Sequence, residues 1–263
     1  MRTNFLKRVA GKWCMLLVSI FVFSGAALAA QGNPGIAPIS SNITDVKNYA
    51  DLGAAWWQWA VQAPAIDNPI NDTTGAKCRV GQQGPVWFLA GTGGSGDLAT
   101  PTVRHCDVPG GKAIFFPVIN VAWFSFITDP AELRTAGAVR SIVEKLCDSS
   151  SIRNLSVTID GVPVARPEKF QTTAEQSPIF QAQLPTDNIY GATTDWIPEL
   201  LLSPSGHKGF YIYLKPLATG SHTVAWTATW NCDFDLDGTY SDVFNENVKY
   251  ELNVLSGVSG QVQ

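Results

Sequence analysis

The chain has 263 residues, of which 45% are hydrophobic and 15% charged, a composition typical of a packed globular protein and not of a disordered chain. Its 18 basic and 22 acidic residues give a net charge of −4 at neutral pH. An acidic protein repels phosphate backbones, so the composition disfavours nucleic acid as a partner.

The first 29 residues have the layout of a secretory signal peptide. Four basic residues lie near the start of the chain, an apolar run extends from Met15 to Phe23, and small residues follow at Ala27 and Ala29. We therefore predict cleavage near Ala29 and export to the periplasm or the exterior, with an uncleaved N-terminal anchor as the alternative. Cleavage would leave 14 basic and 22 acidic residues, a net charge of −8, and no transmembrane segment in the mature chain.

Four cysteines follow the predicted cleavage site, an even number that is typical of disulfide bonds in exported proteins. Four cysteines allow three pairings. We favour Cys78 with Cys106, which closes a short loop between two predicted strands, and by default Cys147 with Cys232. The sequence contains no Cys-x-x-Cys pattern and no cluster of cysteine and histidine, which disfavours a zinc site.

The rest of the chain is predicted to form a single globular domain over residues 44–256. A flexible leader rich in Gly, Pro and Ser precedes it at 30–43, and a frayed tail follows at 257–263. Within the domain, we expect residues 44–150 to combine helices and strands and residues 151–256 to form a β-sandwich part.

A helix is predicted from Thr44 to Gln62, ending before Pro64. The stretch AAWWQWA in this helix places Trp56 and Trp59 on one apolar stripe, with Trp57 about 100° away at its margin. Burial of an indole ring is favourable, so we expect Trp56 and Trp59 in the core and Trp57 partly exposed to a ligand.

The following segments predict buried strands and a second helix. The runs 86–90 and 113–124 are apolar on both faces of an extended strand, whereas 102–106 alternates less regularly and is expected at a sheet edge. The segment DPAELRTAGAVRSIVEKLC predicts an amphipathic surface helix with Asp129 as N-cap, Pro130 at the first helical position and an end near Cys147.

From residue 155 onward the hydrophobic period changes to two. The segment LSVTIDGVPV predicts a hairpin with its turn at Asp160-Gly161, and 209–217, 221–230 and 249–255 predict further alternating strands. We therefore expect a mainly β, α+β fold, an antiparallel β-sandwich that is Ig-like or jelly-roll-like, with about two packed helices in the N-terminal half.

The motifs WWQW, CRVGQQGPVWFLAGT, CDVPGGKAIFFPVIN, VTIDGVPV and PLATGSHTVAW, taken together, resemble those of a group of exported bacterial proteins with no assigned activity. They cover most of the mature chain. The resemblance implies an exported bacterial protein with disulfide bonds, and it implies no ligand and no catalytic residue.

A glycine-rich segment and the three histidines are further candidates for chemistry. The glycine-rich GTGGSG at 91–96 follows a strand but leads into no helix, so we expect a flexible connection and not a phosphate site. The SPSGHKG segment is expected to be a mobile loop that exposes His207. By contrast, His222 is predicted on the inner face of a strand, and His105 at the surface.

The acidic stretch NCDFDLDGTYSD contains the clearest chemical signal. Asp233, Asp235 and Asp237 alternate before a glycine, as in calcium-binding loops, and Asp242 lies close enough in the sequence to be a fourth ligand. Phe244 occupies the position where an EF-hand has a bidentate glutamate. A solvated hairpin turn is therefore the alternative to a Ca²⁺ site, and Ca²⁺ is the one cofactor that the sequence indicates.

The candidate ligand-binding residues are Trp57, Tyr190, Asp195, Trp196 and Glu199. The many aromatic residues and the lack of a catalytic constellation predict a non-catalytic protein that binds carbohydrate or another component of the cell envelope. One alternative is a secreted hydrolase acting on polysaccharide or ester polymers, with loop carboxylates as acid and base. The other is a calcium-stabilised structural module.

Overall fold

A computed structural model describes residues 35–36 and 48–256. The predicted signal peptide, nearly all of the predicted leader and the tail at 257–263 lie outside the described residues. Contacts within the chain group the described residues into one unit. None of the described helices is long and apolar enough to cross a membrane.

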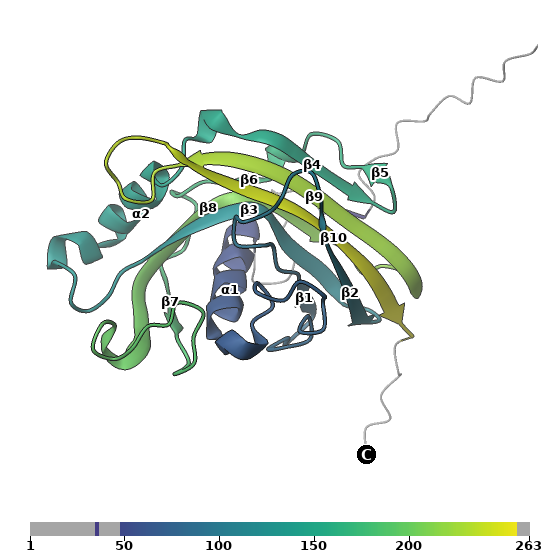
Figure 1. Ribbon diagram of the computed structural model, residues 1–263, viewed down its shortest axis with the longest axis horizontal. Helices are drawn as coiled ribbons and strands as arrows, with labels where there is room; N and C mark the ends of the chain where they lie inside the picture. The colour runs from purple at the N-terminus through teal and green to yellow at the C-terminus, as the bar shows by residue number, and fades with distance from the viewer. Residues whose placement is uncertain (1–34, 37–47, 257–263) are drawn as a thin grey trace, which may run out of the picture. The chain divides into compact units, whose positions relative to one another are not determined.

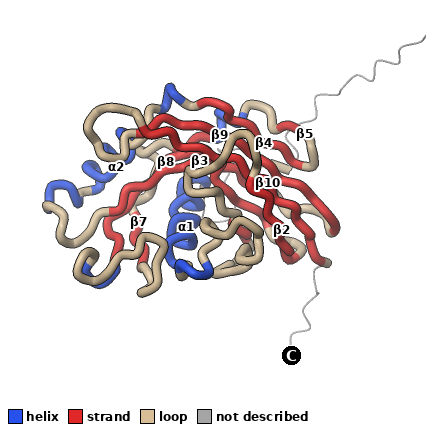
Figure 2. Tube along the Cα trace, viewed as in Figure 1, coloured by secondary structure: helices blue, strands red, loops and turns tan. Residues whose placement is uncertain are grey.

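Two five-stranded sheets form the fold (Figures 1 and 2), and the predicted mainly β sandwich is confirmed. The first sheet has the order β1-β3-β8-β6, with β7 also paired to β8, and the second has the order β2-β10-β9-β4-β5. Most pairs are antiparallel. The edge strands β1 and β2, however, pair in parallel with β3 and β10, so both sheets are mixed. The strands are β1 (Val86–Phe88), β2 (Thr102–Pro109), β3 (Ala113–Phe124), β4 (Arg153–Ile159), β5 (Val162–Pro163), β6 (Gln171–Thr172), β7 (Phe180–Gln183), β8 (Leu201–Leu214), β9 (Gly220–Cys232) and β10 (Asp242–Leu255).

The first sheet is covered on both faces, which explains its continuous apolar runs. Neighbouring residues of β3 point to opposite sides. Phe116 stacks on Trp226 of β9, with ring centroids 4.6 Å apart, whereas Phe115 contacts Tyr49 of the helix α1 (Tyr49–Gln62) at 6.0 Å. Figure 1 shows α1 against β3 and β8 on the side away from β9 and β10. Each sheet contains strands from before and after residue 150, so the two predicted parts of the domain are interleaved.

The tryptophan-rich helix begins later than predicted but buries the expected face. Asn48 is its N-cap and forms a capping box with Asp51. Trp56 and Trp59 are buried, as predicted, and each indole N–H donates to a backbone carbonyl, at 2.9 Å to Leu89 and 2.8 Å to Val80. Trp57 is half-buried at the margin of the stripe. The indoles of Trp56 and Trp59 therefore serve the core.

The second helix differs from its prediction at its start. Asp129 is not the N-cap, because a short 3₁₀ turn separates it from α2 (Ala136–Lys145) and its carboxylate instead accepts the backbone N–H of Phe126 at 2.8 Å. Thr135 caps α2 through its hydroxyl, which accepts the Ala138 N–H. A local pattern of Asp, Pro and Glu does not distinguish a 3₁₀ turn from the first turn of an α-helix. The 3₁₀ helices are Ala65–Asp67, Ala131–Arg134, Ser149–Ser151, Pro167–Phe170 and Pro198–Leu200.

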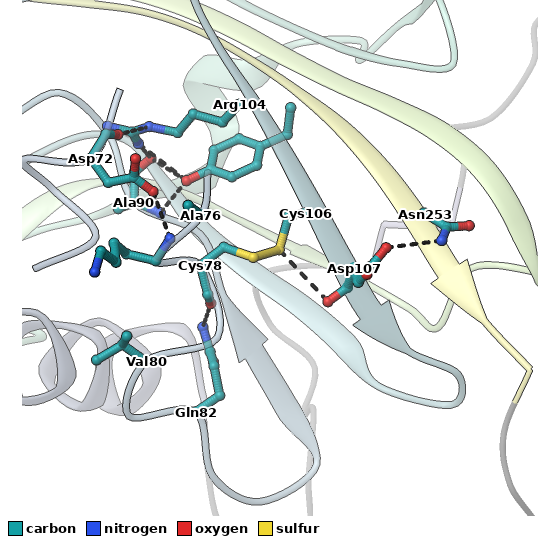
Figure 3. Close-up of a disulfide and its surroundings, with 12 residues drawn as sticks. Asp72, Ala76, Cys78, Val80, Gln82, Ala90, Arg104, Cys106, Asp107 and Asn253 are labelled. Carbon is teal, nitrogen blue, oxygen red and sulfur yellow. Dashed lines mark hydrogen bonds between the residues drawn. A yellow bond between two sulfur atoms is a disulfide. The ribbon is translucent and has the colours of Figure 1, made fainter. Parts of the chain in front are cut away.

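Both predicted disulfides are present, Cys78–Cys106 and Cys147–Cys232. Figure 3 shows the first, which ties the loop at 72–82 to β2 close to the Arg104 side chain. The second joins Cys147, two residues after the end of α2, to the last residue of β9. The predicted hairpin of β4 and β5 is confirmed as well, with positive φ at Asp160 and Gly161 as a type I′ turn requires.

Candidate ligand-binding site

A cavity of about 490 Å³ lies where α1, β3, β10 and four loops meet. This volume lies within the range of small-molecule sites. Its walls carry six aromatic side chains, from Trp56, Trp57, Phe124, Tyr190, Phe234 and Phe244. The polar side chains on its walls are Asn71, Thr92, Ser95, Asn120 and Glu246, and none of the described lysine, arginine or histidine residues lines it. The cavity therefore combines apolar rings with neutral and acidic polar groups.

Glu246 on β10 is a buried carboxylate held by the glycine-rich loop at 91–96. One of its oxygens accepts the backbone N–H and the hydroxyl of Thr92, at 2.7 and 2.9 Å, and the other accepts the Gly94 N–H at 3.1 Å. Burial raises the pKa of Glu246, against the opposing effect of these hydrogen bonds. Backbone N–H groups that would otherwise be free to hold a phosphate are thus occupied by a side-chain carboxylate, which argues against a phosphate site here.

The composition of this loop follows from its close approach to β10. A Cβ at Gly94 would lie 1.8 Å from the Phe244 ring, and the residue has a φ of +81°. Only glycine fits both conditions. The loop is therefore fixed against β10 by contacts, and the expectation of a flexible connection does not describe it.

Arg104 supports the loops that form this wall of the cavity, on the side away from the cavity. The residue is 1% exposed, and its guanidinium donates to the carbonyls of Ile70, Asp72, Ala90 and Gly91 and to the Tyr250 hydroxyl. Figure 3 shows Arg104 between Asp72 and Ala90. One side chain from an edge strand therefore joins two loops that carry cavity residues, Ile70 and Gly91.

On the opposite wall, Asn120 and Trp57 lie between the cavity and a buried pair of side chains, His207 and Tyr211. The Tyr211 hydroxyl is 2.8 Å from His207 Nδ1, and His207 Nε2 is 2.8 Å from the Ala50 carbonyl. The carbonyl can only accept, so Nε2 carries the proton and Nδ1 accepts from Tyr211. This leaves the Tyr211 oxygen as the acceptor facing the buried donors Asn120 Nδ2 and Trp57 Nε1.

The contacts of those two donors are loose. Neither Asn120 Nδ2 nor Trp57 Nε1 reaches full hydrogen-bond geometry with an acceptor, yet both are close enough to Tyr211 to oppose the rise that burial causes in its pKa. Burial also lowers the pKa of His207 to about 4, so this histidine is neutral at pH 7. The network contributes no charge to the cavity and leaves two buried donors of the wall, Asn120 Nδ2 and Trp57 Nε1, without a well-formed hydrogen bond.

His207 corrects an expectation. The SPSGHKG segment is not a mobile loop but part of β8, and His207 is fully buried. Its ring fills the space beside Gly53 of α1, where a Cβ would lie 2.3 Å from it. Glycine, serine and proline in this segment imitate a loop signal, but they serve close packing of β8 against both helices and β3. His105 is exposed, as expected, and His222 is half-buried and pairs with Asp160 at 2.7 Å.

The predicted ligand-binding residues separate into two groups. Trp57 and Tyr190 line the cavity, and Trp196 lines an adjoining trough that it shares with Tyr190. Asp195 and Glu199 are exposed and line neither hollow. The sequence therefore identified aromatic residues that line the two hollows. The carboxylates of Asp195 and Glu199, which are close to them in the chain, line neither hollow.

Glu246 and Asn120 were missed by the sequence analysis. A signal for Glu246 existed, because the alternation that places Tyr250, Leu252 and Val254 inward along β10 also places residue 246 inward. A charged residue at an inward position is expensive to bury unless it is paired, and so marks a structural or functional role. Asn120 lies in a strand buried on both faces, where alternation gives no information.

The acidic turn between β9 and β10 brings Asp233, Asp235 and Asp237 together, with one oxygen of each within 4.8 Å of the others. Asp233 is buried, and its two oxygens accept the backbone N–H groups of Asp237 and Gly238 at 3.0 and 2.9 Å. The hydrogen bond with Asp233 raises the pKa of Asp235. Asp242 stands apart from this cluster and accepts the Phe234 N–H at 3.0 Å.

A comparison of the chain with known proteins gives no relatives. No family model matches it, and neither a curated protein nor a solved structure is similar to it.

Proposed function

We propose that this chain is an exported, non-catalytic binding protein whose cavity holds one sugar ring of a carbohydrate ligand. The observation that carries the proposal is the composition of the cavity walls, six aromatic side chains together with amide, hydroxyl and carboxylate groups and no cationic side chain. A sugar ring presents apolar C–H faces that pack on aromatic rings. Its hydroxyls, at the same time, donate to carboxylate and amide oxygens.

The electrostatics of the cavity favour a neutral ligand over an anion. Glu246 is its one described acidic side chain and no cation faces it. Arg104 lies behind the wall, where each of its three guanidinium nitrogens donates to a carbonyl or a hydroxyl of the chain, and it is not among the residues that line the cavity. An anionic ligand would have to displace water without gaining a counter-charge.

Export is part of the proposal. Its support is the layout of residues 1–29 and the two disulfide bonds, because disulfides persist in oxidising compartments outside the cytoplasm. Binding is favoured over hydrolysis because a glycosidase needs two carboxylates about 5–10 Å apart around the scissile bond. Glu246 is the one described carboxylate on the cavity wall, and the exposed Asp195 and Glu199 do not reach it.

The test is a screen of the purified mature chain on a glycan array, followed by titration calorimetry with the strongest hit. We expect Tyr190→Ala to weaken binding about tenfold, since an aromatic contact contributes about 1 kcal/mol or more. Tyr240→Ala is the matched control, because Tyr240 is an exposed tyrosine that lines neither the cavity nor the trough. An array without a hit, or equal losses in both variants, would contradict the proposed function.

A second candidate function, stabilisation by Ca²⁺, is favoured by the convergence of three carboxylates at the turn between β9 and β10. Oxygen ligands at this separation suit a calcium ion. The test compares the melting temperature in excess Ca²⁺ and in chelator. A rise of a few degrees with Ca²⁺ that Asp235→Asn abolishes supports the site, and identical melting temperatures reject it.

A further inference from the structure

A second hollow adjoins the cavity. It is a trough of about 270 Å³ whose walls include Phe126, Asp129 and Trp196, and it shares Ala122, Phe124 and Tyr190 with the cavity. Because the same three side chains bound both hollows, the two are neighbours separated by the ridge that Phe124 and Tyr190 form. The ring centroids of these two residues are 6.2 Å apart.

Trp196 is the most informative side chain of the trough. It is 58% exposed, whereas the other described tryptophans are buried or half-buried. Its ring meets Phe126 in a T-shaped contact at 6.3 Å, and more than half of the side chain stays exposed. Exposure of a large apolar ring forgoes the free energy of its burial, and such rings beside a pocket mark interaction sites.

The loop that carries Tyr190 and Trp196 is held in place before any ligand arrives. Asn188 is 3% exposed, its amide donates to the carbonyls of Pro185 and Ala192, and its oxygen accepts the N–H groups of Tyr190 and Ala192. Ile197, next to Trp196, is buried in a second apolar cluster that is distinct from the main core. A preset aromatic surface loses little conformational entropy when it binds.

The trough also offers a polar partner. Asp129 has one carboxylate oxygen engaged with the Phe126 N–H, and no described donor occupies the other. An aromatic face with a carboxylate oxygen beside it repeats, on a smaller scale, the combination found in the cavity. The two hollows are therefore chemically alike and suit repeating units of one ligand.

We propose that the trough is a second subsite and that the ligand is a linear oligosaccharide or polysaccharide chain of at least two units. One unit occupies the cavity, the chain crosses the Phe124 and Tyr190 ridge, and the next unit packs on Trp196. This proposal rests on the proposed function, because it extends the same carbohydrate site.

The experiment measures affinity against chain length. Calorimetry uses the mature chain with β-linked oligomers of glucose, N-acetylglucosamine, mannose and xylose, from monosaccharide to hexasaccharide. We expect affinity to rise about tenfold or more when a second and third unit are added, and Trp196→Ala to abolish this rise while it leaves monosaccharide affinity unchanged. Tyr190→Ala lowers affinity for every length, because Tyr190 borders both hollows.

The matched control is Ile127→Ala, an exposed apolar residue next to Phe126 that lines neither hollow, and it should keep the wild-type series. Affinity that does not depend on length, or a Trp196→Ala series identical to the wild type, overturns the second subsite and leaves the proposed function standing. Lack of binding to every oligomer overturns both. Melting temperatures of all variants establish that each one folds.

Discussion

At the scale of single residues, Glu246 illustrates how a buried charge is retained. Its carboxylate accepts three hydrogen bonds, from the two donors of Thr92 and from the Gly94 N–H. Glu246→Gln keeps the size of the side chain but turns an NH₂ group toward backbone donors. We expect a loss of about 2 kcal/mol in the free energy of unfolding at pH 7, measured with urea.

The control for this change is Glu251→Gln. Glu251 forms an exposed ion pair with Lys249 and lies 3.2 Å from the His105 ring, and such exposed contacts contribute little to stability. We expect its substitution to leave the free energy of unfolding nearly unchanged. Equal losses in the two variants would show that the loop at 91–96 does not depend on the Glu246 carboxylate.

His207 predicts a dependence of stability on pH. Burial lowers its pKa from 6.5 to about 4 in the folded protein, so the unfolded chain binds the proton more readily between these values. Stability from this group is therefore complete above pH 6.5 and falls as the pH falls toward 4. The expected loss between pH 7 and pH 5 is about 2 kcal/mol.

Urea unfolding of His207→Gln at both pH values tests this expectation. The variant should lose the contribution of residue 207 to the pH dependence, whatever its stability at pH 7. His105→Gln is the control, because the His105 side chain is 71% exposed. An unchanged pH dependence in His207→Gln would mean that the histidine is not buried as described.

At the scale of elements, the two disulfides constrain different lengths of chain. Cys147–Cys232 spans 85 residues and Cys78–Cys106 spans 28. In the chain-entropy model, a longer closed loop restricts the unfolded state more strongly. Replacing the first pair by alanine should therefore cost about 4–5 kcal/mol and replacing the second about 3–4 kcal/mol.

The measurement is urea unfolding of the two double variants under identical conditions. The longer bridge also joins the end of α2, where Lys208 donates to the carbonyls of Glu144 and Cys147, to the end of β9. If loss of the shorter bridge were the more damaging, stabilisation would come from local contacts near Cys78 and not from chain entropy.

At the scale of the whole molecule, the architecture turns most indole rings inward. Of the eight tryptophans in the described residues, five are buried, Trp57 and Trp123 are half-buried and Trp196 is exposed. A water-soluble quencher should therefore act mainly on Trp196. In the mature chain, which begins after Trp13, Trp196→Phe should remove most of the acrylamide-quenchable fluorescence. Quenching that persists in this variant would contradict the layered arrangement of α1 and the two sheets.

The sequence alone determined the features that depend on local periodicity and on cysteine number. The stripe of Trp56 and Trp59, the alternation along β9 and β10 and the two-sided run of β3 are patterns that neighbouring residues impose on one element. The even number of cysteines, together with the short spacing of Cys78 and Cys106, was enough to predict both bridges.

Only the tertiary structure decided the site. Glu246 and Asn120 belong to strands that are far apart in the chain, and the cavity exists because α1, β3 and β10 meet there. The SPSGHKG segment resembles a loop in the sequence, but in the fold Gly53 of α1 leaves room for the His207 ring and Gly206 lets β8 approach α2 closely. Periodicity reports which face of an element is buried. Which side chains from different elements meet, and whether a hollow is left between them, depends on packing across long sequence separations.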